Sequence, residues 1–477
     1  MNPKTLMCAV SLVCLISCST KPMPAGVSLM SMTGSPSSPR LLKLPSPPEL
    51  ECNRGTYQGA FFAHDGLEDL RGYTAITGDL ILDNSTKLMT LTVHMTALQC
   101  LTSIGGSLLL SNMSQIRSLK SLSRLRSVGG DLIISRTGLE SLTGLENLEE
   151  VDGDLELWHN PWLKDLSALG RLRRVYSITL QNNHGLEEIG GLSTVRHLNG
   201  RLSIVYNPAL KSLSGFEQLQ TVGGPLNILH NTQLASLYGL SGLESTQKAV
   251  EIRNNPFLTD LSGLDRLGQI GTDLTISNNA RLKSLDGLSS LSKVRDLQLL
   301  NNPALTHLDG LQQLHTAQTI HIETSPRLQN IQALYNLKIL GNLTVVGTKQ
   351  LRSLRGLPPL FNAQNIRLED NIALQDFNAL SSIARLKSLT LTRNNTLTNL
   401  DFLTSLQTFT HTIHIAHNDA LADITGLSHL TQGGLALHIH HNPALCRENV
   451  QELAQTLQKR TRPTPSISHH NHPQCSP

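Results

Sequence analysis

The chain has 477 residues, of which 39 are Lys or Arg and 36 are Asp or Glu, so its formal net charge at pH 7 is +3. Acidic and basic residues are spread through the chain, and aromatic residues make up only 3% of it. Without a basic stripe or a series of aromatic side chains, the composition argues against a nucleic-acid partner.

The N-terminal segment, residues 1–17, has the pattern of an export signal. Lys4 precedes an apolar run from Leu6 to Ile16, which is too short to span a bilayer, and the phrase Leu-Ile-Ser-Cys ends at Cys18. This pattern resembles a bacterial lipoprotein signal, which implies cleavage before Cys18 and lipidation of that residue. Ser19 does not resemble an inner-membrane retention signal, so the expected location is the bacterial cell envelope, in the outer membrane. The alternative is ordinary secretion with an unmodified Cys18.

Residues 18–51 are expected to form a tether after the lipidated cysteine. Seven Pro and seven Ser lie between Ser19 and Glu51, with almost nothing to bury. A segment of this composition cannot offset the entropy of ordering, which predicts disorder.

The cysteines agree with export. Two leave with the signal and a third is the expected lipid site, so four remain, two at each end of the chain's central part. Three pairings are possible, and pairing within each end is favoured because the central part separates the ends. Free thiols are the alternative. The favoured pairs are Cys52 with Cys100 and Cys446 with Cys475.

Residues 80–445 repeat one short phrase, whose plainest copies begin at Leu202 and Leu274. After one longer first step, the copies follow one another at a nearly constant spacing of about 23 to 24 residues, a period typical of a solenoid. In a solenoid each unit buries its apolar side by stacking on the next. The first apolar residues of the sixteen copies, here called anchors, are Leu80, Leu108, Leu132, Leu155, Ile178, Leu202, Leu226, Val250, Leu274, Leu297, Ile320, Leu343, Ile366, Leu389, Ile413 and Leu437.

Each unit has the pattern of a strand followed by a coil. The anchor and the residue two positions later are apolar, as expected for a short strand with one buried face. The rest has Leu at every third residue, as at Leu282, Leu285 and Leu288, which fits no single helical stripe. The expected fold is mainly β, a right-handed parallel β-helix or leucine-rich solenoid of about sixteen rungs.

A cap is expected at each end of this solenoid. Residues 52–79 form the N-terminal cap and residues 446–477 the C-terminal cap. In the latter, Val450, Leu453 and Leu457 have helical spacing, and a histidine-rich tail follows.

Asn stands five residues after the anchor in eleven copies. Asn bonds nearby backbone and tolerates a left-handed backbone, so stacked copies are expected to pair the turn amides of adjacent rungs. Glycine pairs such as Gly129-Gly130 are expected to supply positive φ where the chain swings back towards the next strand. The predicted Asn ladder is Asn160, Asn183, Asn207, Asn231, Asn255, Asn279, Asn302, Asn371, Asn394, Asn418 and Asn442.

Three phrases resemble the receptor L-domain family: Val128 to Ile134, Asn255 to Leu264, and the start at Cys52 to Tyr57. That family comprises the leucine-rich, β-helix-like, ligand-binding lobes of insulin-receptor and epidermal-growth-factor-receptor ectodomains, and it also occurs in bacterial surface lipoproteins. The resemblance covers about residues 52–445 and implies a ligand-binding solenoid. The chain differs from the receptor lobes in its unbroken length and in Tyr73, which stands where they place their second cysteine.

The outward strand positions do not predict an enzyme. At the first and third positions after the anchor, no two carboxylates are adjacent in one column, whereas a glycosidase needs two carboxyl groups within about 5 to 10 Å. The sequence contains neither a nucleophile elbow nor a P-loop. A polysaccharide-active β-helix enzyme built from converging loops is the alternative.

Histidines gather near the end of the array. His414 and His438 occupy the same position of consecutive rungs, and His440 stands on the same face, so these three are the candidate ligands for Zn²⁺, Cu²⁺ or Ni²⁺. His417 and His441 form a second stacked pair. The alternative is a solvated histidine face without a metal, and no other cofactor is expected.

These features predict a cell-envelope lipoprotein, held to the membrane by its N-terminal lipid, whose solenoid surface binds a protein or glycan ligand without covalent chemistry. A structural spacer of the envelope is the second alternative to that function.

Overall fold

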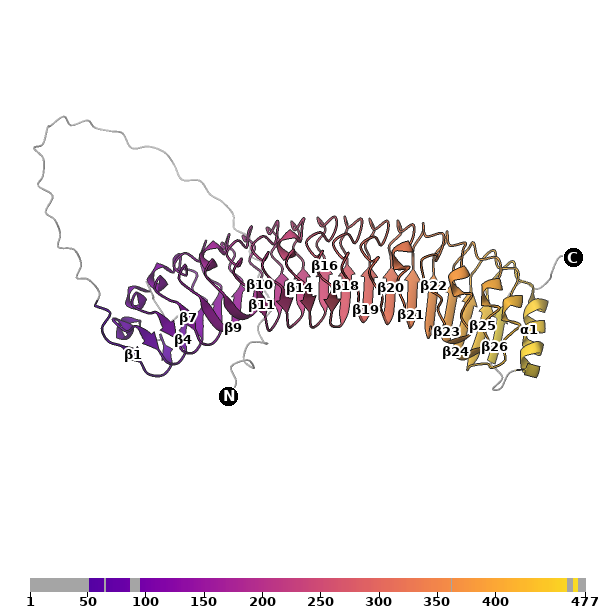
Figure 1. Ribbon diagram of the computed structural model, residues 1–477, viewed down its shortest axis with the longest axis horizontal. Coiled ribbons are helices and arrows are strands. Elements are labelled where there is room, and N and C mark those ends of the chain that lie inside the picture. The colour runs from indigo at the N-terminus through magenta and orange to yellow at the C-terminus, as the bar shows by residue number, and fades with distance from the viewer. Residues whose placement is uncertain (1–50, 64–65, 86–94, 362, 461–465, 471–477) are drawn as a thin grey trace, which may run out of the picture. The chain divides into compact units, whose positions relative to one another are not determined.

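Parallel strands stack side by side in the computed structural model, which describes residues 51–63, 66–85, 95–361, 363–460 and 466–470 (Figure 1). The predicted anchors pair in register from Leu80 with Leu108 through to Ile413 with Leu437, so each copy of the phrase is one rung. The predicted parallel β-solenoid and its repeat are therefore confirmed.

The main wall of the solenoid holds one strand from each of the sixteen copies. Its strands are β4 (Leu80–Asp83), β6 (Leu108–Ser111), β8 (Leu132–Ser135), β9 (Glu150–Trp158), β10 (Arg174–Gln181), β12 (Leu202–Val205), β14 (Leu226–Leu229), β16 (Val250–Arg253), β18 (Asp273–Ser277), β19 (Asp296–Leu300), β20 (Thr319–Glu323), β21 (Asn342–Val346), β22 (Asn365–Glu369), β23 (Arg385–Thr392), β24 (Thr408–Ala416) and β25 (Ala436–His440).

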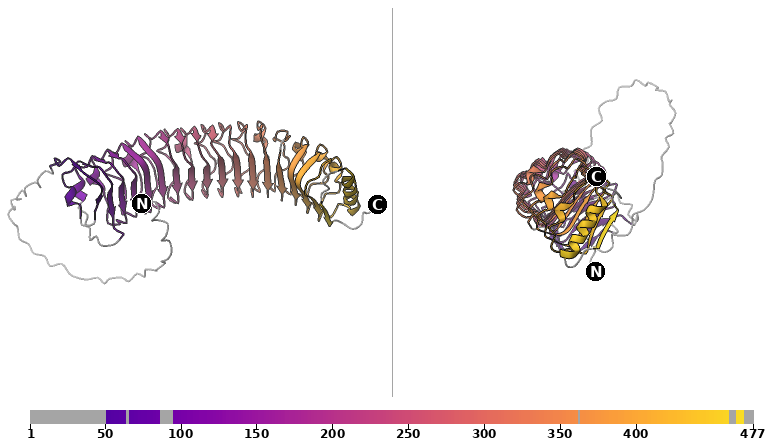
Figure 2. Two further views of the ribbon diagram at one scale, coloured as in Figure 1. Left: turned by 90° about the horizontal axis from the view of Figure 1, so that it is seen from below. Right: turned by 90° about the vertical axis from the view of Figure 1, so that its right-hand side faces the viewer.

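The stack extends one strand beyond the predicted copies at each end. At the N-terminal end β2 (Phe61–Phe62) pairs with β4, placing Phe61 beside Leu80. At the other end β26 (Ser466–His470) pairs with β25, and α1 (Arg447–Arg460) precedes it. Figure 2 (right) shows α1 lying across the C-terminal end of the stack. Both segments that the sequence assigns to caps thus add a rung of their own.

A second wall of two-residue pairings runs beside the main one. The first halves of β9 and β10 also belong to this second wall, where Glu150 pairs with Arg174. Isolated one-residue bridges extend the second wall from Gln269 to Ile339. Its short strands are β1 (Thr56–Tyr57), β3 (Ala75–Ile76), β5 (Ser103–Ile104), β7 (Ser127–Val128), β11 (His197–Leu198), β13 (Thr221–Val222), β15 (Ser245–Thr246) and β17 (Gln269–Ile270).

Short 3₁₀ turns occupy the return side of many rungs. They are η2 (Glu68–Leu70), η3 (Met95–Leu98), η4 (Lys120–Leu122), η5 (Ser167–Leu169), η6 (Tyr238–Leu240), η7 (Gln332–Leu334), η8 (Asn378–Leu380), η9 (Asp401–Leu403) and η10 (Thr425–Leu427).

The core is a set of parallel apolar columns inside the coil. Leu202 and Ile204 of β12 are fully buried, and so are the every-third-residue leucines Leu282, Leu285 and Leu288. Full burial of one such side chain contributes about 1.5 to 3 kcal/mol. Because each rung covers its neighbour's apolar edge, no rung could bury these side chains alone.

The backbone turns at the residue before the ladder Asn rather than at the Asn itself. The fourth residue after the anchor has a left-handed φ in all copies from Leu108 onward, from 50° at Arg136 to 60° at Asp370, with Gly347 at 69°. A left-handed residue ends the strand sharply and directs the next side chain into the core. The expectation that the ladder Asn has the left-handed conformation is wrong, because the residue directly before it has that conformation.

The glycine pairs before the strands serve close packing. Neither Gly129 nor Gly130 has positive φ, contrary to the sequence-based expectation. A Cβ on Gly129 would lie 2.2 Å from the carbonyl oxygen of Gly105 in the preceding rung, and one on Gly130 would lie 2.5 Å from Ser107 Oγ. Any larger residue would therefore push two rungs apart.

The N-terminal segments fall outside this description. The predicted signal, residues 1–17, Cys18 and the tether as far as residue 50 lie outside the described residues. Among the described residues, no helix is long and apolar enough to cross a membrane.

Candidate functional site

The predicted Asn residues form a hydrogen-bonded column inside the corner, in two stretches from Asn160 to Asn302 and from Asn371 to Asn442. All eleven are fully buried. In Asn279, Oδ1 accepts a hydrogen bond from the backbone amide of Asn255, and Nδ2 donates to the carbonyl of Ile252, both at 3.0 Å. The amide of Asn279 in turn donates to Oδ1 of Asn302 at 3.1 Å. One side chain thus pairs a turn amide and a strand carbonyl of the preceding rung, which is a structural role.

The column has a gap where two rungs lack Asn. Ser325 and Thr348 take the equivalent positions, and both are fully buried. Thr348 donates from its amide and its hydroxyl to Oδ1 of Asn371, at 3.1 and 2.6 Å. The hydroxyl of Ser325 has no hydrogen-bond partner among the described residues. A buried hydroxyl without a partner marks a weak point in the column.

The three described cysteines, Cys52, Cys100 and Cys446, lie towards the two ends of the stack. Cys52 and Cys100 are joined by a disulfide with 5.3 Å between their Cα atoms, which brings together the first predicted pair. Cys446 is disulfide-bonded, whereas Cys475 lies outside the described residues. The second predicted pair therefore stays a prediction.

Carboxylates do meet in adjacent rungs, at a position that the sequence analysis did not consider. Just before the anchors, Asp273 pairs in register with Asp296. Both are held by Arg295, at 2.7 Å to Asp273 and 3.3 Å to Asp296. In the same column Asp131 Oδ1 accepts the amide of Asp154 at 2.8 Å. These acids are engaged in ion pairs and backbone bonds, so their contacts are those of structural groups.

The histidines at the C-terminal end gather around His440. His414 and His438 pair in register, as expected, with 6.1 Å between ring centroids. Yet His440 approaches His414 more closely, with 3.2 Å between their Nε2 atoms. On its other side, His440 Nδ1 lies 2.8 Å from His441 Nδ1. His417 and His441 stack at 4.7 Å. The sequence predicted the pairing of His414 with His438, whereas the structure joins His440 to His417 and His441 as well as to His414.

Burial and mutual proximity lower the pKa of two of these rings, which favours their neutral form. Burial lowers the pKa of His414 from its ordinary value, and the neighbouring His438 lowers it further while Glu369 opposes the shift. Burial also lowers the pKa of His440, with His414 and His441 adding to the effect. Neutral imidazoles offer lone pairs to a metal ion or a hydrogen-bond donor.

A hollow of about 470 Å³ opens beside these histidines. His414, His417 and His440 line it together with Glu369, which Arg367 and Arg393 hold by ion pairs. Thr392 also lines it, and its buried Oγ1 has no hydrogen-bond partner among the described residues.

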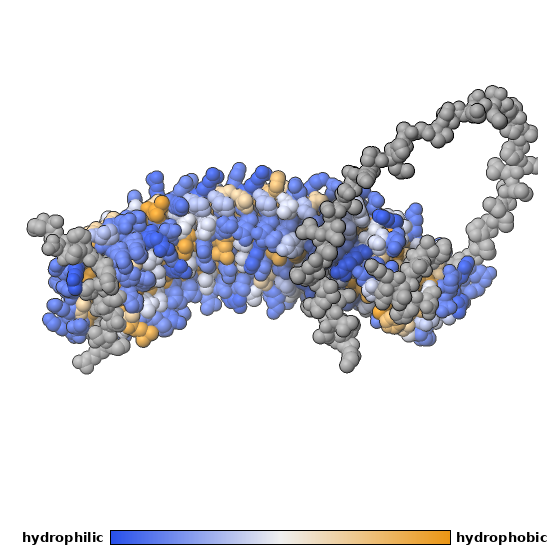
Figure 3. All heavy atoms as spheres, turned by 180° about the vertical axis from the view of Figure 1, so that it is seen from behind, coloured by the Kyte–Doolittle hydropathy of each residue, from blue (hydrophilic) through white to orange (hydrophobic). Residues whose placement is uncertain are grey.

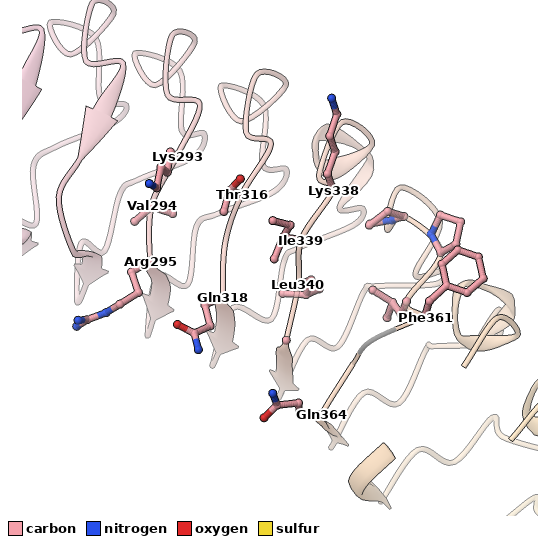
Figure 4. A pocket seen from close by; sticks show the side chains of 14 residues that line it. Lys293, Val294, Arg295, Thr316, Gln318, Lys338, Ile339, Leu340, Phe361 and Gln364 are labelled. Carbon is pink, nitrogen blue, oxygen red and sulfur yellow. The ribbon is translucent and has the colours of Figure 1, made fainter. Parts of the chain in front are cut away.

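A second, more apolar pocket of about 480 Å³ lies beside the second wall (Figure 4). Its floor contains the buried residues Val294, Leu340 and Leu360. Figure 4 shows Lys293, Thr316 and Ile339 on successive rungs along the pocket, with Phe361 beyond Ile339. A Pro-Pro step at residues 358–359, the single one in the repeats, forms part of the lining.

The edge of this pocket combines exposed apolar and cationic side chains. Ile339 is 57% exposed and Phe361 64% exposed. Lys293 and Lys338 are exposed as well, and none of the fourteen described residues that line the pocket is acidic. The face seen in Figure 3 is mostly hydrophilic, with apolar side chains in small groups. Exposed apolar side chains beside a cavity are a feature of interaction sites.

Comparison with known proteins finds matches to solved structures at low identity. No family model and no curated protein matches the sequence. Solved structures that match include an internalin of Listeria monocytogenes, at 14% identity and a TM-score of 0.33, covering 82% of this chain and 88% of that one. A leucine-rich repeat protein of Leptospira interrogans matches at 16% identity and a TM-score of 0.31, covering 73% and 97%. A chain of the Drosophila Toll–Spätzle complex matches at 15% identity and a TM-score of 0.39, covering 90% and 67%.

Likeness at this level carries no argument about what the chain binds. The assignment to the parallel solenoids rests on the register of its own strands.

Sequence reasoning did not find the pocket. Its residues lie along the second wall and between Pro358 and Gln364, whereas the sites expected from the sequence were at outward positions of the main wall. The Pro-Pro step was the available signal, because two residues without amide hydrogens interrupt backbone pairing.

Proposed function

We propose that the chain is a cell-envelope lipoprotein whose solenoid binds a protein or glycan ligand without covalent chemistry. The observation that carries the binding role is the pocket between Lys293 and Gln364, with its apolar floor, exposed Phe361 and cationic rim. The resemblance of residues 52–445 to the receptor L-domain family supports the same role.

The chemistry of the pocket favours a ligand that has an apolar group next to a negative charge. An apolar group would cover Val294, Leu340 and Leu360, while a carboxylate would meet Lys338 or Lys293 at the rim. Arg295 contributes less, because Asp273 and Asp296 already engage it. A surface loop of a protein with an acidic residue beside an aliphatic or aromatic one has this chemistry.

The proposed membrane anchor rests on the N-terminal sequence. The apolar run before Cys18 and the Pro- and Ser-rich segment after it are the pattern of a lipidated cysteine on a tether. Lipid on Cys18 would hold the solenoid at a membrane surface, with the tether giving it reach. A single acyl chain binds membranes only marginally, so stable anchoring requires the multiple chains of a lipoprotein.

Protein and glycan arrays probed with the full chain test the binding role. We expect a ligand whose binding falls at least tenfold on Phe361→Ala and on Lys338→Glu. The matched controls are Tyr238→Ala and Lys248→Glu, which change exposed residues outside the pocket. Ligands that bind all four variants equally would exclude this pocket, and an array without ligands would favour the spacer.

Two further experiments address the anchor and the enzyme alternative. Cys18→Ser is expected to release the chain from membranes or to leave an unprocessed precursor, and membrane-bound, lipid-labelled Cys18→Ser protein would contradict the anchor. Turnover of an envelope polysaccharide by the purified chain would favour the enzyme over the binding protein.

A further inference from the structure

Three imidazoles meet at one point on the outer surface of the C-terminal rungs, and we propose that His417, His440 and His441 bind one transition-metal ion of the Zn²⁺, Cu²⁺ or Ni²⁺ class. One ring nitrogen from each lies within 4.8 Å of the other two. In the part of the chain that the structure describes, no other group of three His, Cys, Asp or Glu side chains has this spacing. The site is separate from the pocket beside Phe361 and does not depend on it.

The backbone explains why these rings meet. His417 and His441 directly follow the ends of β24 and β25, and their φ angles of 58° and 55° are both left-handed. Since the two residues have the same conformation in adjacent rungs, their rings stack with 11° between their planes. His440 pairs in register with the small residue Ala416, and its ring lies 6.0 Å from that of His417.

The nitrogen positions fit a site that holds a proton when no metal is bound. Nδ1 of His440 and Nδ1 of His441 are 2.8 Å apart. Two facing lone pairs repel at this distance, so one of the two nitrogens carries a hydrogen and donates it to the other. A tetrahedral ion with bonds of about 2.0 to 2.1 Å to nitrogen holds its ligand atoms about 3.4 Å apart. Metal binding at both Nδ1 atoms therefore requires the tautomer of His441 that carries its hydrogen on Nε2, with no net loss of a proton, and moves the two nitrogens apart by roughly 0.6 Å. His441 is exposed at the surface.

His414 is suited to orient the central ligand. Its Nε2 lies 3.2 Å from Nε2 of His440, on the far side of the His440 ring from His441. A hydrogen on His440 Nε2 donated to His414 leaves the lone pair on Nδ1, the atom that faces His441. Metal-bound histidines commonly donate their second ring hydrogen in this way. His414 is thus a positioning residue, not a ligand.

The surrounding charges do not oppose a cation. Arg393 and Arg367 are the nearest positive side chains in the adjoining hollow, and Glu369 pairs with both. Arg393 also lies 3.5 Å from Asp370. Two positive charges are therefore balanced by two negative ones. Because all three ligands are imidazoles and none is a carboxylate, the site selects against Ca²⁺ and Mg²⁺.

Calorimetric titration of the full chain, without a histidine tag, with ZnCl₂ or CuCl₂ at pH 7.5 tests the site. We expect one ion per chain, loss of binding in His440→Ala, and at least tenfold weaker binding in His417→Ala and in His441→Ala. His414→Leu should weaken binding about 10- to 100-fold, and His414→Gln, which keeps a hydrogen-bond acceptor, should lose less. The Cu²⁺ electron paramagnetic resonance spectrum should show nitrogen ligands and should change in His417→Ala.

Matched variants separate this site from other histidines. His230→Ala removes a left-handed histidine that stacks on Tyr206 in a distant rung, and it should leave affinity unchanged. His438→Ala should also leave affinity unchanged. Loss of binding in His438→Ala with normal binding in His417→Ala would assign the ion to His414, His438 and His440 and overturn our ligand set.

Two other results would contradict the site altogether. The first is the absence of binding when about 10 μM chain is mixed with a 100-fold molar excess of metal. Circular dichroism must show in the same sample that the protein is folded. The second is binding that disappears when His469, His470 and His472 are replaced by Ala, because the ion would then belong to the tail.

Discussion

The amide of Asn255 donates a hydrogen bond to Oδ1 of Asn279, 3.0 Å away in the next rung. The same contact recurs along the corner between Asn160 and Asn302, and again between Asn371 and Asn442. Within these two stretches each rung is therefore joined to the next by one fully buried Asn side chain, and such nearest-neighbour contacts add up along a solenoid.

Replacing Asn279 by Ala should destabilise the rungs locally. The amide of Asn255 and the carbonyl of Ile252 would be left buried without partners, at a cost of about 1 to 3 kcal/mol. Hydrogen exchange should accelerate around residues 250–305 and stay unchanged near the ends. Asn227→Ala, at an outward strand position, is the control. Parental exchange rates in Asn279→Ala would mean that the column does not stabilise the stack.

Restoring the column at its gap should stabilise the protein. In Ser325→Asn, the new Oδ1 would accept the amide of Asn302, and the unpartnered hydroxyl would be removed. One added buried hydrogen bond contributes about 0.5 to 1.5 kcal/mol, which should raise the midpoint of urea unfolding. Ser325→Ala, which removes the hydroxyl without adding a bond, is the comparison. If both variants unfold at the same urea concentration, the Asn contact does not form there.

The disulfide between Cys52 and Cys100 should stabilise the first rungs. It spans 48 residues of sequence, and closing a loop of that size contributes about 3 to 4 kcal/mol. Cys52→Ser with Cys100→Ser should therefore increase protease cleavage before β6 while leaving rungs near β25 protected. Non-reducing peptide mapping of the parent checks the pairing, and free thiols at both positions would refute it. The same map tests the predicted pair of Cys446 with Cys475.

His159 should titrate below its ordinary value. Burial, then the charge of Arg136 and then His184 lower the pKa of His159 from 6.5. The unfolded chain binds its proton at about 6.5 and the folded chain only at lower pH, so stability is lost as the pH falls from 6.5 towards the folded pKa. NMR titration should show this lowered pKa. Arg136→Gln should raise it only in part, because burial remains the largest cause, and Arg71→Gln should not move it. A pKa of 6.5 or above in the parent would contradict the shift.

Much of the fold follows from the sequence because each rung meets its neighbours at a constant spacing. The nearly constant period, the alternation at each anchor and the Asn positions are properties of the chain itself, and they predicted the strand register from Leu80 to Leu437. The sequence did not predict the two end rungs, because Phe61-Phe62 and Ile467 lie outside the constant period. Their pairing with β4 and β25 in the structure identifies them as rungs.

The tertiary structure decided which neighbours a side chain actually meets. Sequence position placed His414 beside His438, but the small Ala416 and the left-handed backbone at His417 and His441 draw the His440 ring into a different group. The pocket beside Phe361 likewise depends on Lys293 and Lys338, which belong to different rungs. A repeat pattern determines which residues share a column, because that depends on backbone spacing alone. The repeat pattern does not determine which residues of neighbouring columns a side chain contacts, because its rotamer depends on the volume and rotamer of every neighbour.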